Sequence, residues 1–319
     1  MKTISIILLS LFFFGFISCD SEKNIEKEKI SHDFTTIEEL DKIASFKFYI
    51  FSDNKGDANT THFNKMIEWT KDRDMKFVIG LGDHLKKGFE NTFLGFLENN
   101  IDFKNNFYPT IADGENEYYG ESQGDWGAGS EFLNLVELNK RTNTQMRENN
   151  VEYYSVFKFG EIKIHLITLH YPDEPSDDSV SFKQDSKDYL INTLNSIDKT
   201  DKDFVIVTAH SRLGYWHSQL SQSELEIVMN KVDLGLSATT HLFSKFTVEN
   251  YPDYGTLFIN TGAIGYPFLE NGEGYIEISF LTNPNEFVLH YVSTTDENLQ
   301  ISTKTKYYVK RISGKFIEY

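Results

Sequence analysis

The sequence contains a single cysteine, Cys19, so no disulfide within the chain can stabilise the fold. Basic residues are also scarce: Lys and Arg number 31 against 48 Asp and Glu, which gives a formal net charge of −17. Because so acidic a chain repels phosphate backbones, we expect no nucleic-acid partner. After the N-terminus there is no apolar run long enough to span a bilayer, no internal repeat and no linker between domains. Stability must therefore come from one large hydrophobic core.

The N-terminus has the order of a secretory signal peptide over residues 1–18. Lys2 precedes an apolar run that extends to Ile17, and the small residue Ser18 precedes Cys19. The alternative is a transmembrane anchor, but the run is shorter than the roughly 20 apolar residues that a span requires. A small residue followed directly by cysteine resembles the lipobox of bacterial lipoproteins. That resemblance implies cleavage before Cys19 and acylation of its side chain.

The segment 19–44 is charged and poor in apolar residues, which predicts a flexible tether between the lipid and a folded domain at 45–319. The acidic residues that follow the cysteine resemble sorting signals that keep lipoproteins at an outer membrane. We therefore expect anchoring to a membrane of the cell envelope through Cys19, with the outer membrane favoured and envelope or outer-membrane proteins as partners.

Apolar runs alternate with helical patterns in the first third of the domain, in the order β-α-β-α-β. Later runs predict further strands and three more helices, and the C-terminus predicts a hairpin. Composition agrees with a globular α/β protein, since aromatic residues reach 15% and predict a ring-rich core. The predicted strands cover 46–51, 76–81, 107–112, 153–159, 162–169, 204–209, 232–238, 256–261, 274–281, 287–293 and two in 304–319; the predicted helices cover 60–74, 89–99, 131–141, 184–197 and 221–231.

Polar and acidic residues follow several of these strands, where sites form in open α/β sheets. Oxygen and imidazole ligands together suit Mn, Fe or Zn. The alternatives are that the aspartates cap helices and that the histidines are buried, hydrogen-bonded imidazoles. His84 is either a replacement ligand or a loop residue. The candidate ligands are Asp53, Asp83, Glu115, His210 and His241.

The order of these residues resembles the calcineurin-like metallophosphoesterase family, in the style of purple acid phosphatases, over roughly residues 45 to 293. The family reads D-x-H, then G-D, then G-N-H-D or G-N-H-E, then a lone His after a strand, then G-H-x-H. The resemblance implies a four-layer αββα sandwich, with a two-metal site at its top edge that hydrolyses phosphoesters. The corresponding stretches here are Asp53-Asn54-Lys55, Gly82-Asp83, Gly114-Glu115-Asn116-Glu117, His210 and Ala238-Thr239-Thr240-His241.

Four departures from the family pattern affect the chemistry that the resemblance implies. Lys55 replaces the His of the first motif, Glu115 replaces the Asn ligand, and Thr239 replaces a His ligand. Asn116 replaces the His that assists the leaving group, and an amide has no proton to give near neutral pH. An ammonium at a metal position repels cations, so we hypothesise that Lys55 pairs with Asp53 or Asp83 and substitutes for the first metal.

Two classes of function follow from the sequence. The first is a non-catalytic binding or scaffold subunit of an envelope assembly, which keeps the phosphoesterase fold. The second is an active phosphomonoesterase or phosphodiesterase that uses one divalent metal or a rewired pair. A simple anion-binding role at Lys55 is a third alternative. The metal content expected is accordingly one divalent ion (Mn, Fe or Zn) or none.

Overall fold

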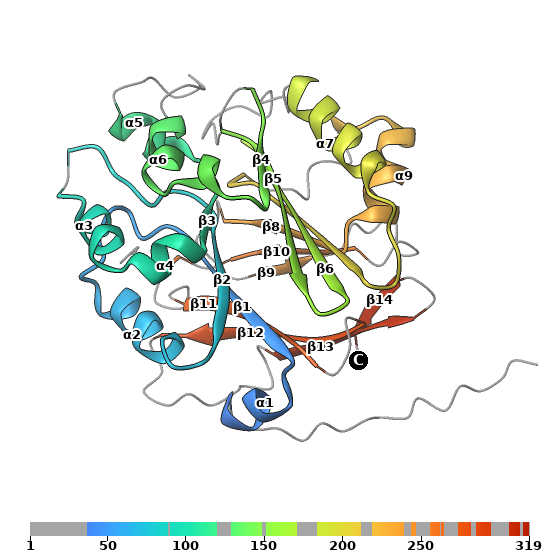
Figure 1. Cartoon of the computed structure of the whole chain (residues 1–319), viewed down its shortest axis with the longest axis horizontal. Helices are drawn as coiled ribbons and strands as arrows, with labels where there is room; N and C mark the ends of the chain where they lie inside the picture. The colour runs from blue at the N-terminus through green and yellow to red at the C-terminus, as the bar shows by residue number, and fades with distance from the viewer. Residues whose placement is uncertain are drawn as a thin grey trace, which may run out of the picture. The chain divides into compact units, whose positions relative to one another are not determined.

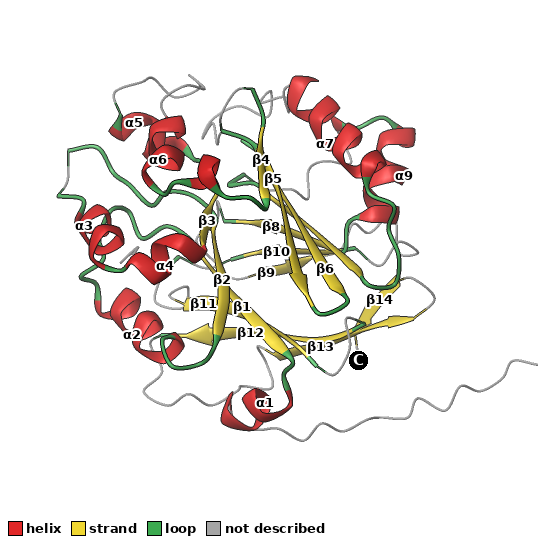
Figure 2. Ribbon diagram, in the orientation of Figure 1, coloured by secondary structure: helices red, strands yellow, loops and turns green. Residues whose placement is uncertain are grey.

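Two seven-stranded sheets pack face to face in the computed structural model, and helices cover their outer faces (Figure 1, Figure 2). This is the four-layer α/β arrangement that the sequence predicts. Residues Phe34–Tyr319 form one folded unit. The structure describes residues 37–88, 90–119, 129–148, 151–170, 184–211, 219–238, 244–246, 256–261, 263–264, 274–281, 285–294, 306–312 and 315–318.

The first sheet joins the N-terminal strands to the C-terminal ones. Its parallel half is β1, β2 and β3, and β1 pairs with β11 in antiparallel register, which attaches a meander that ends in the predicted C-terminal hairpin. The strand order is β14 (Lys315–Glu318), β13 (Lys306–Ile312), β12 (Glu286–Ser293), β11 (Gly274–Phe280), β1 (Phe46–Phe51), β2 (Met75–Gly80) and β3 (Phe107–Pro109).

The second sheet is built from the middle of the chain. A parallel run of β6, β7, β8 and β10 forms its centre, with antiparallel strands at both edges. The order is β4 (Thr144–Met146), β5 (Tyr153–Phe159), β6 (Ile162–Thr168), β7 (Asp203–Thr208), β8 (Leu234–Ser237), β10 (Leu257–Asn260) and β9 (Ser244–Phe246).

Local sequence signals start the main helices. The Thr60 hydroxyl accepts a hydrogen bond from the Phe63 N–H at the start of α2, and Ser221 and Glu224 form a capping box at α9. Helices α7 and α9 pack apolar residues onto the second sheet. The helices are α1 (Ile37–Ile43), α2 (Thr61–Thr70), α3 (Thr92–Asn99), α4 (Ile101–Asn106), α5 (Asp113–Tyr118), α6 (Gly129–Leu135), a 3-10 turn (Leu138–Lys140), α7 (Gln184–Ser196) and α9 (Gln222–Lys231).

The core between the sheets is rich in aromatic rings, as the composition predicts. Phe77 of the first sheet stacks on Phe157 of the second, with ring centroids 4.1 Å apart. Phe204 of the second sheet meets Phe280 of the first edge to face at 4.9 Å. Such contacts add to the stabilisation that apolar burial supplies, and they hold the two sheets in one relative position.

Helix α1 lies inside the segment that the sequence predicts to be a flexible tether. Its Asp41 accepts two hydrogen bonds from the Arg73 guanidinium, both at 2.7 Å, and pairs with Lys47 of β1. Arg73 also donates two hydrogen bonds to the fully buried Glu277 of β11, at 2.7 and 2.6 Å. This ionic network attaches α1 to the first sheet. Helix α1 is therefore part of the folded domain and not of a tether.

Four short elements besides α1 differ from the sequence expectation. Helices α4 and α5 and strands β4 and β9 have three to six residues each, too few to show a periodicity. The predicted signal segment, the acylated Cys19 and the first part of the tether lie outside the described residues, so they stay predictions. Within the described residues, no helix is long and apolar enough to cross a membrane.

Candidate metal centre

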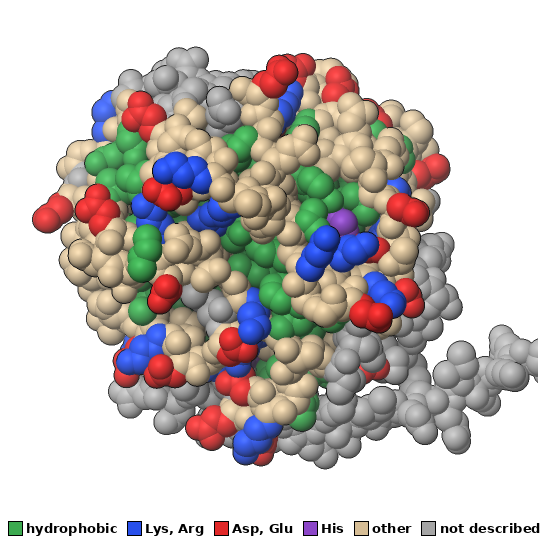
Figure 3. Space-filling view, in the orientation of Figure 1, with side chains coloured by type: hydrophobic (Ala, Val, Ile, Leu, Met, Phe, Trp, Pro, Cys, Tyr) green, Lys and Arg blue, Asp and Glu red, His purple; other side chains and the backbone are tan. Residues whose placement is uncertain are grey.

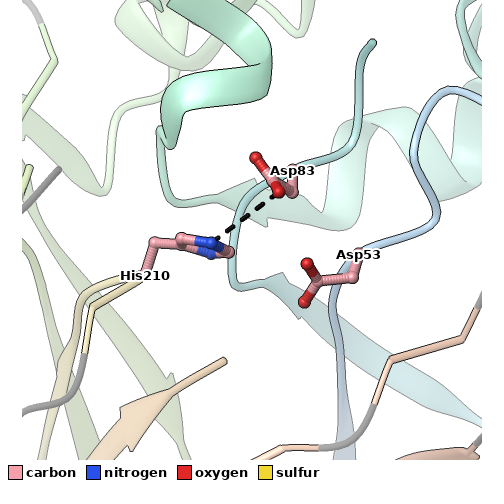
Figure 4. A group of neighbouring side chains, drawn as sticks. All are labelled: Asp53, Asp83 and His210. Atoms are coloured by element: carbon pink, nitrogen blue, oxygen red, sulfur yellow. Dashed lines mark ion pairs between the residues drawn. The ribbon is translucent and has the colours of Figure 1, made fainter. Parts of the chain in front are cut away.

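Three of the predicted ligands meet where the two sheets come together at the carboxyl ends of their parallel strands. Asp53 follows β1, Asp83 follows β2 and His210 follows β7, and one ligand atom from each lies within 4.8 Å of the others (Figure 4). All three residues are buried. Figure 4 shows the three side chains converging from separate strand ends.

The loops after β1 and β2 hold the aspartates in an unusual backbone conformation. Asp53, Lys55 and Asp83 have φ values of 54°, 48° and 55°, in the left-handed region. Backbone hydrogen bonds connect the two loops: the Asp53 N–H donates to Gly82 O at 3.1 Å and the Lys55 N–H to Asp83 O at 2.9 Å. Strained backbone that neighbours hold in place is a feature of functional sites.

Gly82 allows the two sheets to approach each other beside the cluster. Its φ is 90°, and a Cβ there would lie 2.6 Å from Ala112 Cβ and 2.9 Å from His210 Nδ1. Any side chain at this position would clash with Ala112 and with the ring of His210. The glycine of the Gly82-Asp83 pair is therefore required by the close approach as well as by the turn.

His210 has the tautomer that a metal ligand needs. Its Nδ1 lies 2.6 Å from the Leu81 carbonyl oxygen, which can only accept, so Nδ1 carries the proton. In the neutral ring the lone pair is therefore on Nε2, which lies 3.9 Å from Asp83 Oδ2. A hydrogen bond from the second ring nitrogen is how ligating histidines are oriented in metal sites.

Lys55 places a cation among the same ligand atoms. Its Nζ lies 3.3 Å from Asp53 Oδ1 and forms a direct ion pair with Asp83 Oδ2. The pairing hypothesised from the sequence is thus present, with both aspartates. The Lys55 side chain is 19% exposed, whereas that of Asp53 is fully buried, so the ammonium enters the cluster from the solvent side.

The donor set fits a divalent ion, and the Lys55 ammonium fits the same space. Two carboxylates and one imidazole are suitable ligands for Mn, Fe or Zn. The two ionised carboxylates carry two negative charges, and Lys55 cancels one of them. A divalent ion between Asp53 and Asp83 would have to displace the ammonium, so the two cations compete for one position.

Glu115, the fourth predicted ligand, supports the loops that carry the cluster. It is fully buried, and its two carboxylate oxygens accept four backbone N–H bonds of 2.5 to 3.2 Å, from residues 83, 84, 85 and 112. Burial raises the pKa of Glu115 to about 7, although these N–H groups favour the charged form. Glu115 lies outside the three-residue cluster, and its role as a ligand stays a prediction.

His84, the alternative ligand, is a fully buried residue of the loop. Its Nε2 accepts the Gly82 N–H at 3.2 Å, so Nδ1 carries the proton and donates to Asn54 Oδ1 at 2.7 Å. The ring lies among phenylalanine rings, the nearest being Phe51 at 4.9 Å. Burial lowers the pKa of His84 to about 3, which keeps it neutral. Both nitrogens serve the loop, so His84 has the role of a structural residue.

The remaining predicted positions are not described in full. Asn116 lies in α5, close in sequence to Glu115. His241 and the replaced position Thr239 lie outside the described residues, as does Cys19, so these assignments stay predictions. Within the part of the chain that the structure describes, every member of the cluster was a candidate from the sequence.

No known family profile matches the chain, and no curated protein does. Solved structures similar to it include a putative 5′-nucleotidase of Staphylococcus aureus, with 15% identity, a TM-score of 0.47, and coverage of 82% of this chain and 56% of that one. A phosphatase of Mycoplasma pneumoniae has 14% identity and a TM-score of 0.41, with 87% and 94% covered. A metallophosphoesterase of Sphaerobacter thermophilus has 12% identity and a TM-score of 0.37, with 78% and 88% covered.

Proposed function

We propose that this chain is a lipid-anchored protein of the cell envelope in which Lys55 substitutes for a metal ion, and that it acts by binding other envelope proteins rather than by hydrolysis. One observation carries the proposal: the Lys55 ammonium pairs with both Asp53 and Asp83. These are the two carboxylates that the first metal would use in the family that the sequence resembles.

The electrostatics of the cluster support a metal-free state. Two buried carboxylates a few ångströms apart repel each other strongly, and a cation between them removes that cost. Lys55 supplies the cation from the chain itself, at a high effective concentration, whereas a metal ion has to be recruited from solution. The built-in cation therefore makes the fold independent of metal supply.

The catalytic positions of the motifs support the same proposal. Asn116 stands where the family has the His that assists the leaving group, and it cannot act as a general acid near neutral pH. Thr239 stands at a ligand position and offers only a neutral hydroxyl. The anchor at Cys19 and an outer-membrane location are parts of the proposal that rest on the N-terminal sequence alone.

A second candidate is a phosphoesterase that works with a single divalent ion. The orientation of His210 favours it, because Nε2 keeps its lone pair and points toward Asp83. In this case Lys55 would move toward solvent when the ion binds between Asp83 and His210. The ion would supply Lewis-acid stabilisation of a phosphoryl oxygen.

Metal content distinguishes the two candidates. The full chain, purified in detergent, is incubated with Mn, Fe and Zn, desalted and analysed by elemental mass spectrometry. We expect no stoichiometric metal in the parent chain and a gain of bound metal in Lys55→His, which restores the D-x-H motif. Asp83→Asn in the Lys55→His background is the matched control and should lose that metal.

Activity and association complete the test. The parent chain should not hydrolyse p-nitrophenyl phosphate or bis-p-nitrophenyl phosphate faster than Asp83→Asn, and it should purify in a stable complex with other envelope proteins. The proposal fails if the parent chain is isolated as a monomer that retains metal and hydrolyses either ester, with both properties lost in Asp83→Asn.

A further inference from the structure

A groove of about 710 Å³ lies at the side of the sandwich, between the β2–β3 edge of the first sheet and the β4–β5 edge of the second. None of its lining residues belongs to the metal-ligand cluster. In the space-filling view, hydrophobic side chains gather near the centre of this face, with charged side chains of both signs around them (Figure 3). The groove itself joins an aromatic floor to a rim that carries lysines.

Strand β5, beside the groove, extends past β4, its neighbour at the edge of the second sheet. β4 pairs only with Tyr153–Ser155, whereas β5 continues to Phe159. The Val156 N–H donates to Asn143 O at 2.9 Å, and the backbone groups of Lys158, two residues further, point to the same side. In the described part of the chain, no strand pairs with this end of β5 on that side. An open strand edge is a template for another strand.

The floor of the groove is made of aromatic rings that the core holds in place. Phe157 stacks on Phe77 with centroids 4.1 Å apart, and Tyr108 meets Phe157 edge to face at 4.7 Å. Phe159 stacks on Phe46 at 4.7 Å. These rings belong to both sheets, so the floor is preformed, and little free energy is needed to organise it for a ligand.

The two charged residues in the described lining of the groove, Lys76 and Lys158, are both basic on an otherwise acidic protein. Lys158 is exposed and lies directly opposite Lys163 in the β5–β6 pair, where like charges are unfavourable. Lys76 on the other rim pairs with Asp74, whose side chain is 78% exposed. Among the described residues that line the groove, none is Asp or Glu. An anionic ligand would relieve the repulsion between Lys158 and Lys163.

We propose that the groove binds an extended peptide segment of a partner protein, in which acidic and apolar residues alternate, as an added strand on the free edge of β5. Side chains alternate between the two faces of a strand. The apolar residues of the segment would therefore lie on the rings of Phe157 and Phe159, and its acidic residues beside Lys158 and Lys163. This inference rests on the proposed function as a binding protein and deepens it by naming the surface and the kind of partner segment. Failure of the peptide test would leave the metal test of the cluster unaffected, because the groove shares no residue with that cluster.

The test uses a fluorescent nine-residue synthetic peptide that alternates glutamate with valine and phenylalanine, and the full chain in detergent. Fluorescence anisotropy should show saturable binding that weakens about tenfold in Lys158→Glu, because the rim charge is reversed. Lys42→Glu in α1 is the matched control, with the same charge change on an exposed lysine outside the groove, and should bind like the parent chain.

Two further comparisons separate strand addition from simple charge attraction. A scrambled peptide of the same composition, without the alternation, should bind at least about tenfold more weakly. Hydrogen exchange at the Lys158 amide should slow when the alternating peptide is bound. The proposal is overturned if the alternating peptide does not bind, if the scrambled peptide binds equally well, if Lys158→Glu has no effect, or if the Lys158 amide is unprotected.

Discussion

Two regions of this molecule place a cation between two carboxylates, and they differ in which cation it is. At the ends of β1 and β2, Lys55 lies between Asp53 and Asp83. On the outer side of the first sheet, Arg73 lies between Asp41 and Glu277. Both clusters are largely buried, so each depends on its cation to offset the cost of desolvated carboxylates.

The hydrogen bonding of the two clusters is unequal. The planar guanidinium of Arg73 donates four hydrogen bonds of 2.6 to 2.7 Å, two to each carboxylate. The Lys55 ammonium reaches the cluster on a flexible stem, and its contact with Asp53 is 3.3 Å. An arginine fork matches carboxylates in geometry, whereas a lysine acts as a point charge.

This difference shows which cation can be exchanged. Arg73 joins α1, the end of α2 and β11, so its loss separates three elements of the fold. Lys55 comes from the solvent side and lies beside His210, whose Nε2 keeps its lone pair. We therefore expect that a divalent ion can take the place of the Lys55 ammonium, whereas the four directed hydrogen bonds of Arg73 have no counterpart in a simple metal ion.

Arg73→Met should have the largest effect on stability. It leaves Asp41 and Glu277 without their shared cation, and breaking a buried pair costs about 3–5 kcal/mol. Equilibrium unfolding in urea, followed by circular dichroism, measures the loss. Arg73→Lys keeps the positive charge but not the planar fork of hydrogen-bond donors. Its free energy of unfolding should therefore lie between those of the parent chain and Arg73→Met. A loss below about 1 kcal/mol for Arg73→Met would contradict this prediction, because it would be no larger than the contribution of a surface ion pair.

Lys55→Met should have a smaller effect that metal reverses. We expect a loss of about 1–2 kcal/mol in the presence of a chelator, since the Lys55 ammonium is partly solvated. Mn²⁺ at about 100 times its Kd should return about 2.7 kcal/mol. Thermal unfolding with and without MnCl₂ measures both effects. If Mn²⁺ stabilised Arg73→Met to the same extent, the contrast between the two clusters would be wrong.

Acid should weaken the Arg73 cluster. Burial would raise the pKa of Asp41, but hydrogen bonds from Arg73 and Lys47 outweigh it and hold that pKa below its ordinary value of 3.8. The stability that Asp41 contributes is therefore fully present above pH 3.8 and is lost as the pH falls through the lower, folded-state pKa. Urea unfolding from pH 5 downward should show this decline in the parent chain and a shallower one in Asp41→Asn.

Asp74→Asn should have the smallest effect on the free energy of unfolding, and it serves as the surface reference for the two buried clusters. Asp74 pairs with Lys76 at the surface, where its side chain is 78% exposed. Solvent screens such pairs, so we expect a change within about 0.5 kcal/mol. Asn also tolerates the left-handed backbone that Asp74 adopts, with φ of 53°. A loss as large as that of Lys55→Met would show that exposure does not separate these ion pairs.

Much of the fold could be predicted from the sequence, because long elements carry their own signals. The strand 46–51 and the helix within 60–74 are present near their predicted bounds. Helix α1 could not be predicted, since seven charged and apolar residues do not make a stable helix alone. This helix depends on the hydrogen bonds that Arg73 donates to Asp41.

The roles of Glu115 and His84 show where sequence reasoning about the site ends. Both residue types are common metal ligands and both follow a strand. Only the folded chain shows that the Glu115 oxygens accept four backbone N–H bonds and that both His84 nitrogens serve the loop. A residue's hydrogen-bond partners depend on the path of distant backbone, which spacing along the chain does not encode.

The sequence by itself determined the α/β order of elements and the residue types at the strand ends, because hydrophobic periodicity and turn chemistry are local. The resemblance in the sequence also implied that Lys55 stands where the family has a metal-ligating His. Only the tertiary structure decided that Asp53, Asp83 and His210 meet within 4.8 Å and that the Lys55 ammonium pairs with both aspartates. These residues belong to two sheets, and their distances follow from how the aromatic core packs the sheets together.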